Sequence, residues 1–498
     1  MSKTQWYAKS TYVLVALALV LSLGVVAVPL RGTVEAVSPA MDYYVTTTGN
    51  NSKSGLDWLN AWKTITYAVE TGATTPGDVI HVADGLYDPA NGENFPIDFN
   101  TNGVSLIGAG GATSIIDANN AEKNILNIWA DEVNISWFEL RNAKVYDWAN
   151  TGNGIYMGAA NDCHISNLEI YHLTMGSGPW TKEPAGIFMD KGSDGNTFSS
   201  IEIYDITSDY QPRGIWCYDS TGNQFTDINI HDVDNTDGDP RGNSCAYGIH
   251  LSWSSGNMFD EITINSITGG NWSEGIQLSY SHNNTLGDLS ISDVYGDKYV
   301  YGILLLDSSD NTFASSSEIW NINAWAGCGI GIGLEKDTEG SNRNTFESFN
   351  IHDTCYGFYI DKSGDNFITK SKIHDNVEGV HLCSAIDECV GNKVNCNDIY
   401  RNTDYGVYKE NPPDVDATDN WWGDASGPSH SPGTGDKISV NVLYGPWLPD
   451  VFEYCEDCGG TRRPPPGVPT VNHWGTVAMI SLFAGLLVWT VRRKRLAS

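Results

Sequence analysis

Basic and acidic residues of the kinds that cleave polysaccharides gather around two long intervals of the chain. Lys182, Arg213, Arg241 and His250 can supply the base and the cation that β-elimination of a uronic acid requires, and Asp190 lies among them. In that reaction the cation neutralises the sugar carboxylate while the base removes the neighbouring proton. These five residues are therefore the candidate catalytic residues of a polysaccharide lyase.

A glycoside hydrolase would instead use two carboxylates placed around one bond. Asp190 paired with Asp219 or with Asp237 is the combination that the sequence offers. Neither set matches a local catalytic signature. The sequence therefore does not decide whether the protein is an enzyme (a lyase, hydrolase or epimerase), and a structural or binding role is the preferred interpretation of these residues.

A row of aromatic and polar residues recurs at one position of a repeated pattern and suits sugar binding. Each repeat starts at a glycine, and the second and fourth residues after it point out of the predicted coil. Aromatic rings stack on the C–H faces of sugars, while amides and carboxylates bind the hydroxyls. The predicted ligand-binding residues are Tyr156, Phe188, Trp216, Tyr218, His250 and Gln277. The alternative is that these rings pack under loops or stabilise the sheet by stacking on one another.

Four aspartates within eight residues form an oxygen-rich run that can wrap Ca²⁺. They are Asp232, Asp234, Asp237 and Asp239. The run lacks the EF-hand spacing and a following Glu, so a solvated acidic turn is the alternative. Weakly bound Ca²⁺ is the one cofactor that the sequence suggests.

A nine-fold repeat between Gly154 and Gly406 positions all of these residues. Each copy holds a glycine, an apolar strand, an Asn before an apolar or aromatic residue, and a second strand that ends in Asp or Asn. Short alternating runs within a period of this length predict stacked strands, because one coil cannot bury its own apolar side. The predicted fold is all-β, a single-stranded right-handed parallel β-helix solenoid of about 11–13 coils.

The glycines and asparagines of the repeat are expected to be structural. Glycine supplies either positive φ or a close approach between backbones. Asparagine tolerates a left-handed corner, and its amide can bind the Asn one coil away.

Both ends of the repeat resemble known β-helix proteins. Trp62-Lys-Thr-Ile-Thr-Tyr-Ala-Val and Gly77-Asp-Val-Ile-His-Val resemble the opening of pectin-lyase-like proteins, which implies a short N-terminal helix that caps the first coil. Asp419-Asn-Trp-Trp-Gly-Asp resembles the closing segment of surface β-helix proteins, including relatives of a periplasmic copper-maturation factor. The resemblance covers about residues 43–450 and concerns fold more than function. Copper is not expected, because Met is sparse and no His or Cys cluster has suitable spacing.

The two ends of the chain predict export and attachment. Residues 1–40 resemble a secretory signal peptide, with Lys3 and Lys9 before an apolar stretch. Residues 41–450 are the β-helix domain, 451–473 a Cys/Pro-rich linker, and 474–498 a C-terminal transmembrane helix with a basic end. Val468-Pro-Thr followed by Trp474-Gly475 resembles IPTL-type sorting signals, which implies a sorting peptidase as partner.

The ten cysteines are consistent with an oxidising compartment. Cys328 and Cys355 lie one coil apart and are expected to pair, and Cys383 with Cys389 is a second plausible pair. Cys217 is expected to be a buried thiol. The sequence Cys455-Glu-Asp-Cys458 is expected to close a small disulfide ring rather than to bind metal.

The strongly acidic composition limits the kinds of partner that the protein is expected to bind. A net charge of −33 disfavours nucleic acid and other polyanions. The favoured function is therefore that of an exported, cell-surface-anchored protein of the cell envelope that binds a polysaccharide or a cell-surface glycan. The alternatives are a polysaccharide lyase, hydrolase or epimerase on the same fold, and a non-enzymatic adhesin or surface-layer protein.

Overall fold

The computed structural model describes residues 39–111, 113–145, 152–175, 183–236, 244–382, 389–430, 432–454 and 458. The chain divides into two compact units, residues 1–39 and 40–498, and the description concerns the second. Among the described residues, no helix is long and apolar enough to cross a membrane. The predicted anchor at 474–498, the predicted signal up to residue 38, and the candidate residues Lys182, Asp237, Asp239 and Arg241 lie outside the described residues.

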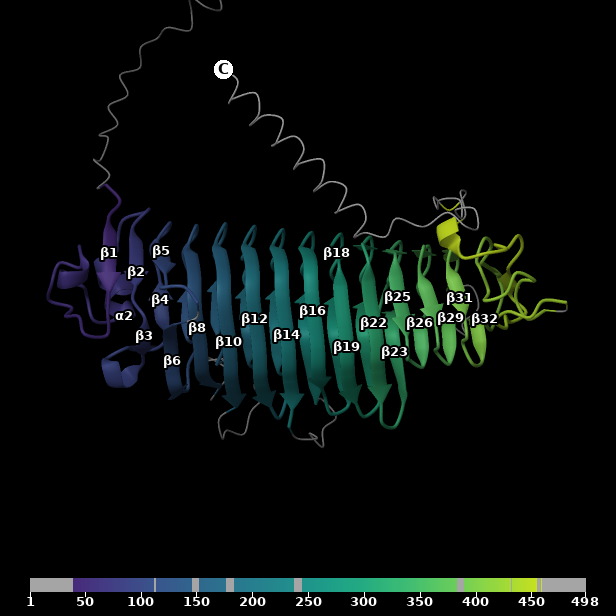
Figure 1. Ribbon diagram of the computed structural model, residues 1–498, viewed down its shortest axis with the longest axis horizontal. Coiled ribbons are helices and arrows are strands. Elements are labelled where there is room, and N and C mark those ends of the chain that lie inside the picture. Colours follow the sequence, from purple (N-terminus) through teal and green to yellow (C-terminus); the bar gives the residue numbers. More distant parts are fainter. Residues whose placement is uncertain are drawn as a thin grey trace, which may run out of the picture. The chain divides into compact units, whose positions relative to one another are not determined.

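Twelve parallel strands, one from each coil, form a continuous sheet along the stack (Figure 1). We call it sheet B, and its strands pair in chain order. The strands are β4 (Ile97–Phe99), β7 (Leu126–Ile128), β9 (Ile155–Gly158), β11 (Ala185–Asp190), β13 (Arg213–Tyr218), β15 (Cys245–Ser252), β17 (Trp272–Ser279), β20 (Tyr299–Leu306), β23 (Cys328–Glu335), β26 (Tyr356–Ile360), β29 (Glu378–Leu382) and β32 (Tyr405–Lys409). These strands confirm the predicted parallel solenoid and its number of coils.

The remaining strands form sheet A, which is also parallel and covers the other sides of the coils. Five coils contribute one long bent strand each: β8 (Asn134–Val145), β10 (His164–Met175), β12 (Thr197–Ser208), β14 (Gln224–Asn235) and β16 (Met258–Thr268). Later coils divide this strand into a pair: β18 (Thr285–Gly287) and β19 (Leu289–Gly296), β21 (Thr312–Ala314) and β22 (Ser317–Ala324), β24 (Thr345–Glu347) and β25 (Phe349–His352), β27 (Phe367–Thr369) and β28 (Lys372–His374), β30 (Lys393–Asn395) and β31 (Asp398–Tyr400). The ends of sheet A are β1 (Asp42–Val45), β2 (Val79–Val82), β3 (Gly85–Tyr87), β5 (Ser105–Ile107), β6 (Ser114–Ala121), β33 (Val415–Asp416) and β34 (Val442–Leu443).

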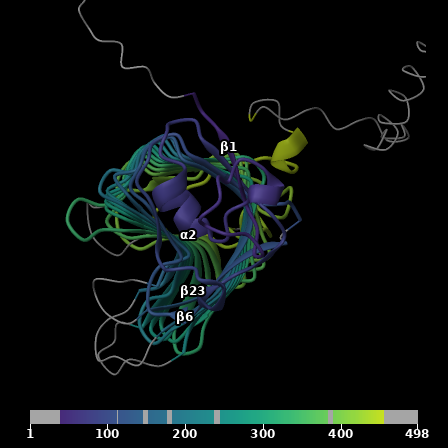
Figure 2. The same ribbon diagram turned by 90° about the vertical axis from the view of Figure 1, so that its left-hand side faces the viewer.

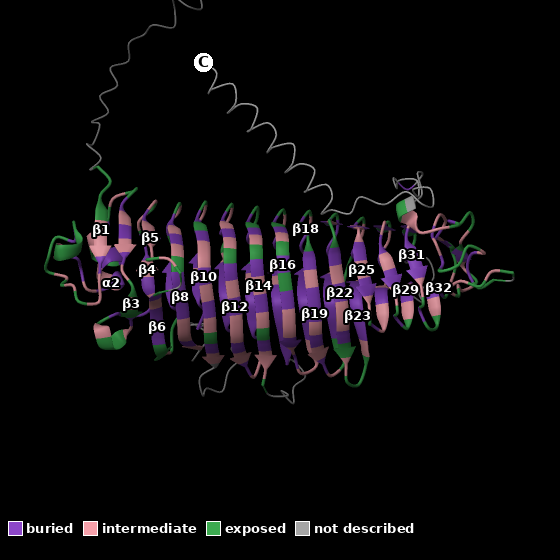
Figure 3. Ribbon diagram, viewed as in Figure 1, coloured by how far each residue is buried: buried purple, intermediate pink, exposed green. Residues whose placement is uncertain are grey.

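The side chains that alternate inward along both sheets fill one core that runs the length of the stack. Figure 2 looks along the stack and shows the coils superimposed, and Figure 3 shows buried positions crossing strand after strand. Within the core, like residues stack on like: the rings of Phe198, Phe225 and Phe259 lie 4.6 and 4.5 Å apart and nearly parallel. The apolar residue after each repeat Asn is therefore a core residue.

The repeat glycines serve close approach and not a left-handed backbone. Gly248 has no positive φ, and a Cβ built on it would lie 2.5 Å from the carbonyl oxygen of Gly275 in the next coil and 2.7 Å from Cγ2 of Ile264. Of the two expected roles, positive φ is therefore wrong and close approach is confirmed. In the coil that contains β23 the repeat glycine is Gly331, because Ile303 pairs with Ile332. Left-handed corners are formed instead by residues such as Asp205 and Asp232, both with φ of 52°.

The repeat asparagines form the predicted ladder between coils. Each Nδ2 donates to Oδ1 of the next Asn, for example Asn284 to Asn311 at 3.1 Å, and each Oδ1 also accepts from a backbone N–H of the preceding coil. The ladder runs through Asn196, Asn223, Asn257, Asn284, Asn311, Asn344, Asn366 and Asn392. All are buried, so the ladder satisfies polar groups that water does not reach.

The N-terminal end carries the predicted helical cap. After the 3-10 turn η1 (Trp58–Asn60), a single α-helical turn, α2 (Ile65–Tyr67), continues into the wider turn η2 (Ala68–Gly72). Thr64 caps it by accepting from the Tyr67 N–H at 3.2 Å, and the buried carboxylate of Glu93, which follows the turn η3 (Pro89–Asn91), accepts from the Ile65 and Thr66 N–H groups. The helix closes the first coil as the family resemblance implied.

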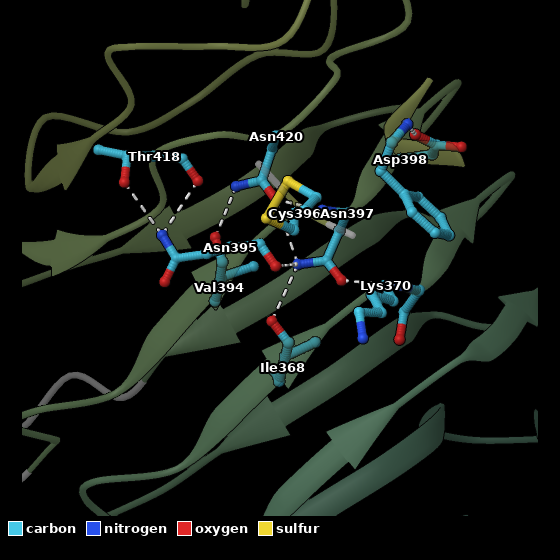
Figure 4. Close-up of a disulfide and its surroundings, with 12 residues drawn as sticks. Ile368, Lys370, Val394, Asn395, Cys396, Asn397, Asp398, Thr418 and Asn420 are labelled. Carbon is cyan, nitrogen blue, oxygen red and sulfur yellow. Dashed lines mark hydrogen bonds between the residues drawn. A yellow bond between two sulfur atoms is a disulfide. The ribbon is translucent and has the colours of Figure 1, made fainter. Parts of the chain in front are cut away.

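A disulfide and a second amide ladder fasten the C-terminal end (Figure 4). Cys396 pairs with Cys458, so the expected ring from Cys455 to Cys458 is wrong. The turn η4 (Phe452–Tyr454) lies against sheet A, where the Phe452 N–H donates to Asp398 of β31. Asn397 donates to the carbonyl of Ile368 at 3.0 Å and to Asn420 at 3.1 Å. The expected pair of Cys328 and Cys355 is confirmed. Cys217 is confirmed as a buried free thiol, and the expected partner of Cys389 lies outside the described residues.

Candidate functional site

Five of the six predicted ligand-binding residues form one continuous stack on the outer face of sheet B. Tyr156, Phe188, Trp216, His250 and Gln277 occupy the same register position in five successive coils. The rings of Phe188 and Trp216 lie 4.2 Å apart at 10°, and those of Trp216 and His250 lie 6.3 Å apart at 7°. The outward direction of the row is therefore as expected.

Most of this row is covered by its own neighbours. Phe188 is only 9% exposed and Gln277 only 8%. Tyr156, Trp216 and His250 are partly buried. Packed in this way, the row stabilises the sheet and offers a ligand only limited ring surface. Tyr218, two residues after Trp216, is the exposed member at 41%.

Two further rings, which sequence reasoning did not select, follow the register partners of Tyr218 in the next two coils. Trp253 and Tyr280 directly follow β15 and β17 at a left-handed corner, and their rings are parallel, 4.3 Å apart at 4°. Trp253 is 54% exposed. We call Tyr218, Trp253 and Tyr280 the ring patch. A large aromatic residue at a corner that other coils fill with residues such as Ala159, Lys191 and Asp219 was the signal available in the sequence.

Polar side chains border the ring patch on three adjacent strands. Tyr218, Ser252 and Ser279 share one register position, and His250 with Gln277 shares the position two residues earlier. The Tyr280 hydroxyl donates to Asp337 at 2.7 Å, which fixes the ring and leaves a carboxylate at its edge. Rings, amide, imidazole, hydroxyls and carboxylate are the groups that recognise sugars.

Arg213, a candidate cation for catalysis, is buried and largely engaged by its neighbours. It is 2% exposed, and its guanidinium lies over the rings of Trp216 (4.0 Å) and Tyr247 (5.1 Å). A guanidinium carries five N–H groups, and four of those on Arg213 have partners among the described residues. Such a group cannot also receive the carboxylate of a uronic acid.

The partners of Arg213 come from the preceding coil, from its own coil and from the next. Nη1 donates to Glu183 at 2.9 Å and Nη2 to the Gln211 side chain at 2.6 Å, while a longer bond reaches the Gln211 carbonyl. Nε donates to Nδ1 of His250 at 3.2 Å. Burial and the adjacent Arg213 charge hold the pKa of His250 well below its usual range. The structure therefore brings Arg213 and His250 together, as the sequence predicted, but as a structural pair.

The candidate carboxylates lie nearer the other end of the row. Asp190 accepts from the Tyr156 hydroxyl at 3.2 Å and ends β11, and Asp219 lies one coil on, immediately after β13. The Gly192 N–H donates to the Asp219 carbonyl, which places the two acids at the same edge of the sheet.

The predicted Ca²⁺ ligands are only partly described. Asp232 accepts from Nδ1 of His231 at 2.8 Å, and the Asp234 carboxyl is half-buried, which raises its pKa. In the described part of the chain, no group of three or more His, Cys, Asp or Glu side chains could hold a metal ion. The Ca²⁺ site stays a prediction, because two of its four ligands lie outside the described ranges.

Two family models match the sequence. One described as "Periplasmic copper-binding protein (NosD)" matches residues 185–427, and one described as "Protein of unknown function (DUF1565)" matches residues 47–115. Together with the twelve stacked coils, these matches decide the class. The chain is a parallel β-helix protein. The NosD match covers slightly less than half of the chain.

Solved structures share the fold of this β-helix protein at low sequence identity. Pectate lyase Pel9A is 14% identical with a TM-score of 0.40, covering 84% of this chain and 82% of the lyase. A mannuronic acid specific polysaccharide family 6 lyase from human gut microbiota is 12% identical with a TM-score of 0.45, covering 74% and 86%. The GH136 lacto-N-biosidase from Eubacterium ramulus is 15% identical with a TM-score of 0.41, covering 82% and 67%. No curated protein sequence matches this chain.

The described residues of this β-helix protein do not fit a copper centre. Copper in proteins is held by several soft or imidazole ligands around one point. Cys217 Sγ lies 3.9 Å from Met189 Sδ, but both side chains are fully buried in the apolar core, and burial raises the pKa of the Cys217 thiol to about 12. A thiol that stays protonated, with one thioether beside it, is packing and not a metal site.

Proposed function

We propose that this protein is an exported, surface-attached β-helix that binds a polysaccharide through the ring patch of Tyr218, Trp253 and Tyr280. The observation that carries the proposal is the parallel pair of Trp253 and Tyr280, whose rings lie 4.3 Å apart with Trp253 more than half exposed. An aromatic surface of this size is costly to leave in water without a partner.

The surroundings of the ring patch support a sugar ligand over an apolar one. His250, Gln277, Ser252 and Ser279 border the rings, and each lies on a rigid strand of sheet B. Fixed polar groups beside an aromatic surface match the alternation of C–H faces and hydroxyls on a glycan.

The acidic charge of the protein favours an uncharged polysaccharide as the ligand. The chain carries a net charge of −33, and Asp337 lies at the edge of the ring patch. Arg213, the buried cation nearest the row, has no capacity left for a ligand carboxylate. An uncharged glycan is therefore favoured over a polyuronate, and lyase chemistry at Arg213 has no support in this geometry.

Export and attachment complete the proposal. The family model that matches residues 185–427 carries the description "periplasmic", which supports export. The signal peptide at 1–40, the linker at 451–473 and the anchor or sorting signal at 474–498 remain proposals. N-terminal sequencing of the mature protein and its extraction from cell envelopes, with and without residues 474–498, would test them.

The binding experiment compares two exposed tryptophans. Full-length protein is screened against neutral, acidic and amino polysaccharides, and the affinity for each hit is measured by calorimetry. Trp253→Ala should weaken binding about tenfold or more, since covering a large apolar side chain contributes about 1.5–3 kcal/mol. Trp325→Ala is the matched control, because Trp325 is 68% exposed and lies after β22, away from the ring patch.

The same samples test for catalysis. New reducing ends or unsaturated products that disappear with Asp190→Ala would assign a glycoside hydrolase or a lyase instead of a binding protein. Equal loss with both tryptophan variants, or binding to cells without binding to any soluble glycan, would refute the proposed site and favour an adhesin.

A further inference from the structure

His250 has one ring nitrogen committed to the protein. Arg213 Nε carries a hydrogen and donates it to Nδ1 of His250 at 3.2 Å. A guanidinium has no lone pair to accept with, so Nδ1 must be the acceptor and cannot carry a proton. The proton of the neutral imidazole is therefore on Nε2.

The surroundings of the ring oppose a second proton. Trp216 from β13 and Tyr247 from β15 stack on the imidazole, and Gln277 from β17 is its partner in the register. Among the described residues, no carboxylate binds this imidazole. The neighbouring guanidinium repels a positive charge, and together with burial it lowers the pKa of His250.

The Nε2 nitrogen faces outward and is available. His250 is partly exposed. Among the described residues, its Nε2 is not one of the polar atoms that are buried without a hydrogen bond. His250 is itself part of the stacked row, paired with Trp216 and Gln277, and lies three residues before Trp253 of the ring patch.

We infer that Arg213 holds His250 as a neutral Nε2–H imidazole that donates a hydrogen bond to a ring, ether or hydroxyl oxygen of the bound glycan. This assignment rests on the proposed function for its ligand and on the Arg213–His250 contact for its proton. His250 is then a recognition residue and not a general base, since its one basic nitrogen is already occupied. Arg213 is a positioning residue that never touches the glycan.

Nitrogen NMR of the full-length protein tests the proton position directly. Long-range ¹H–¹⁵N correlation spectra at pH 5, 6, 7 and 8 report the tautomer of each histidine, and the His250 signals are identified by their loss in His250→Gln. The expected result is a neutral Nε2–H ring at all four pH values. An Nδ1–H ring, or an imidazolium at pH 6, overturns the inference.

Variants of His250 and Arg213 then test whether the Nε2 proton contributes to glycan binding. His250→Gln keeps an N–H donor on a side chain of similar reach, so its glycan affinity should stay within about threefold of wild type, whereas His250→Leu should lose about tenfold. Arg213→Met removes the second of the two causes that lower the pKa of His250, so that pKa should rise toward its ordinary value of about 6.5 while burial keeps it below. Glycan affinity should then depend more on pH than it does in the wild-type protein. If Arg213→Met does not fold, the wild-type spectra and the His250 pair still decide.

The two proposals fail separately. If the spectra show a neutral Nε2–H ring but no glycan binds, the proposed function and the ligand of His250 are refuted. The conclusion that Arg213 fixes the proton of His250 on Nε2 is then still supported. Glycan binding that depends on Trp253 but is equal in His250→Gln and His250→Leu refutes the role of His250 alone.

Discussion

The carboxyl group of Glu274 makes the stability of this solenoid depend on pH. Glu274 lies on β17, is fully buried, and has no hydrogen-bond partner for either oxygen among the described residues. Its register neighbours are the buried rings of Tyr247 and Tyr301. Burial, and after it the charge of Glu335, raises the pKa of Glu274 well above its usual value, although Arg213 opposes the shift.

The sign and size of the effect follow from proton linkage. A carboxyl whose pKa is raised by folding is protonated in the folded state and ionised in the unfolded state at intermediate pH. Stability is therefore highest at or below the ordinary pKa and falls as pH rises toward the raised value. The loss is about 1.4 kcal/mol for each pH unit between the ordinary pKa and the raised one.

Glu274→Gln removes the ionisation and keeps the shape of the side chain. We expect the free energy of unfolding of the variant, measured relative to wild type by urea titration, to improve by about 1.4 kcal/mol per pH unit as pH rises from the ordinary pKa of a glutamate toward the raised one. The control is Glu122→Gln, an exposed carboxyl just after β6, whose difference from wild type should stay flat. A pH-independent difference for Glu274→Gln would show that the carboxyl is paired or hydrated and would refute the reasoning.

Three further perturbations test the solenoid itself. Gly248→Ala should destabilise by about 3 kcal/mol, since its Cβ meets backbone of the next coil, whereas Gly256→Ala, with open space but a φ of 69°, should cost only about 1 kcal/mol in the same denaturation assay. Asn284→Ala should cost about 3 kcal/mol by calorimetric melting, because buried N–H and C=O groups of adjacent coils lose their partners; an unchanged melting temperature would contradict the ladder. Burial raises the pKa of Asp398 to about 7, and Asp398 accepts from the Phe452 N–H at 2.7 Å. Stability should thus fall from about pH 4 to 7 in wild type and less in Asp398→Asn, and parallel pH profiles of the melting temperature would exclude this carboxyl as the cause.

The sequence by itself determined the class of fold and the direction of most side chains. Residues such as Ile249 and Leu251 alternate with His250 around one glycine, and every coil repeats that order, so inside and outside follow from local pattern alone. The Asn ladder followed for the same reason, since each coil places an identical amide at the same corner. The pairing of Cys328 with Cys355 came from the coil length.

Only the tertiary structure decided which of the outward side chains are exposed and which polar groups already have hydrogen-bond partners. Exposure depends on neighbouring coils: Phe188 is outward but covered, whereas Trp253 at the next corner is half exposed. The hydrogen bonds of Arg213 are made with Glu183, Gln211 and His250, which lie up to 37 residues away in the sequence. Cys458 pairs with Cys396, which lies 62 residues earlier in the sequence, and no local pattern indicates that pairing. A repeat specifies where each side chain points, but solvent exposure and hydrogen-bond saturation are set by contacts between coils, which no single coil encodes.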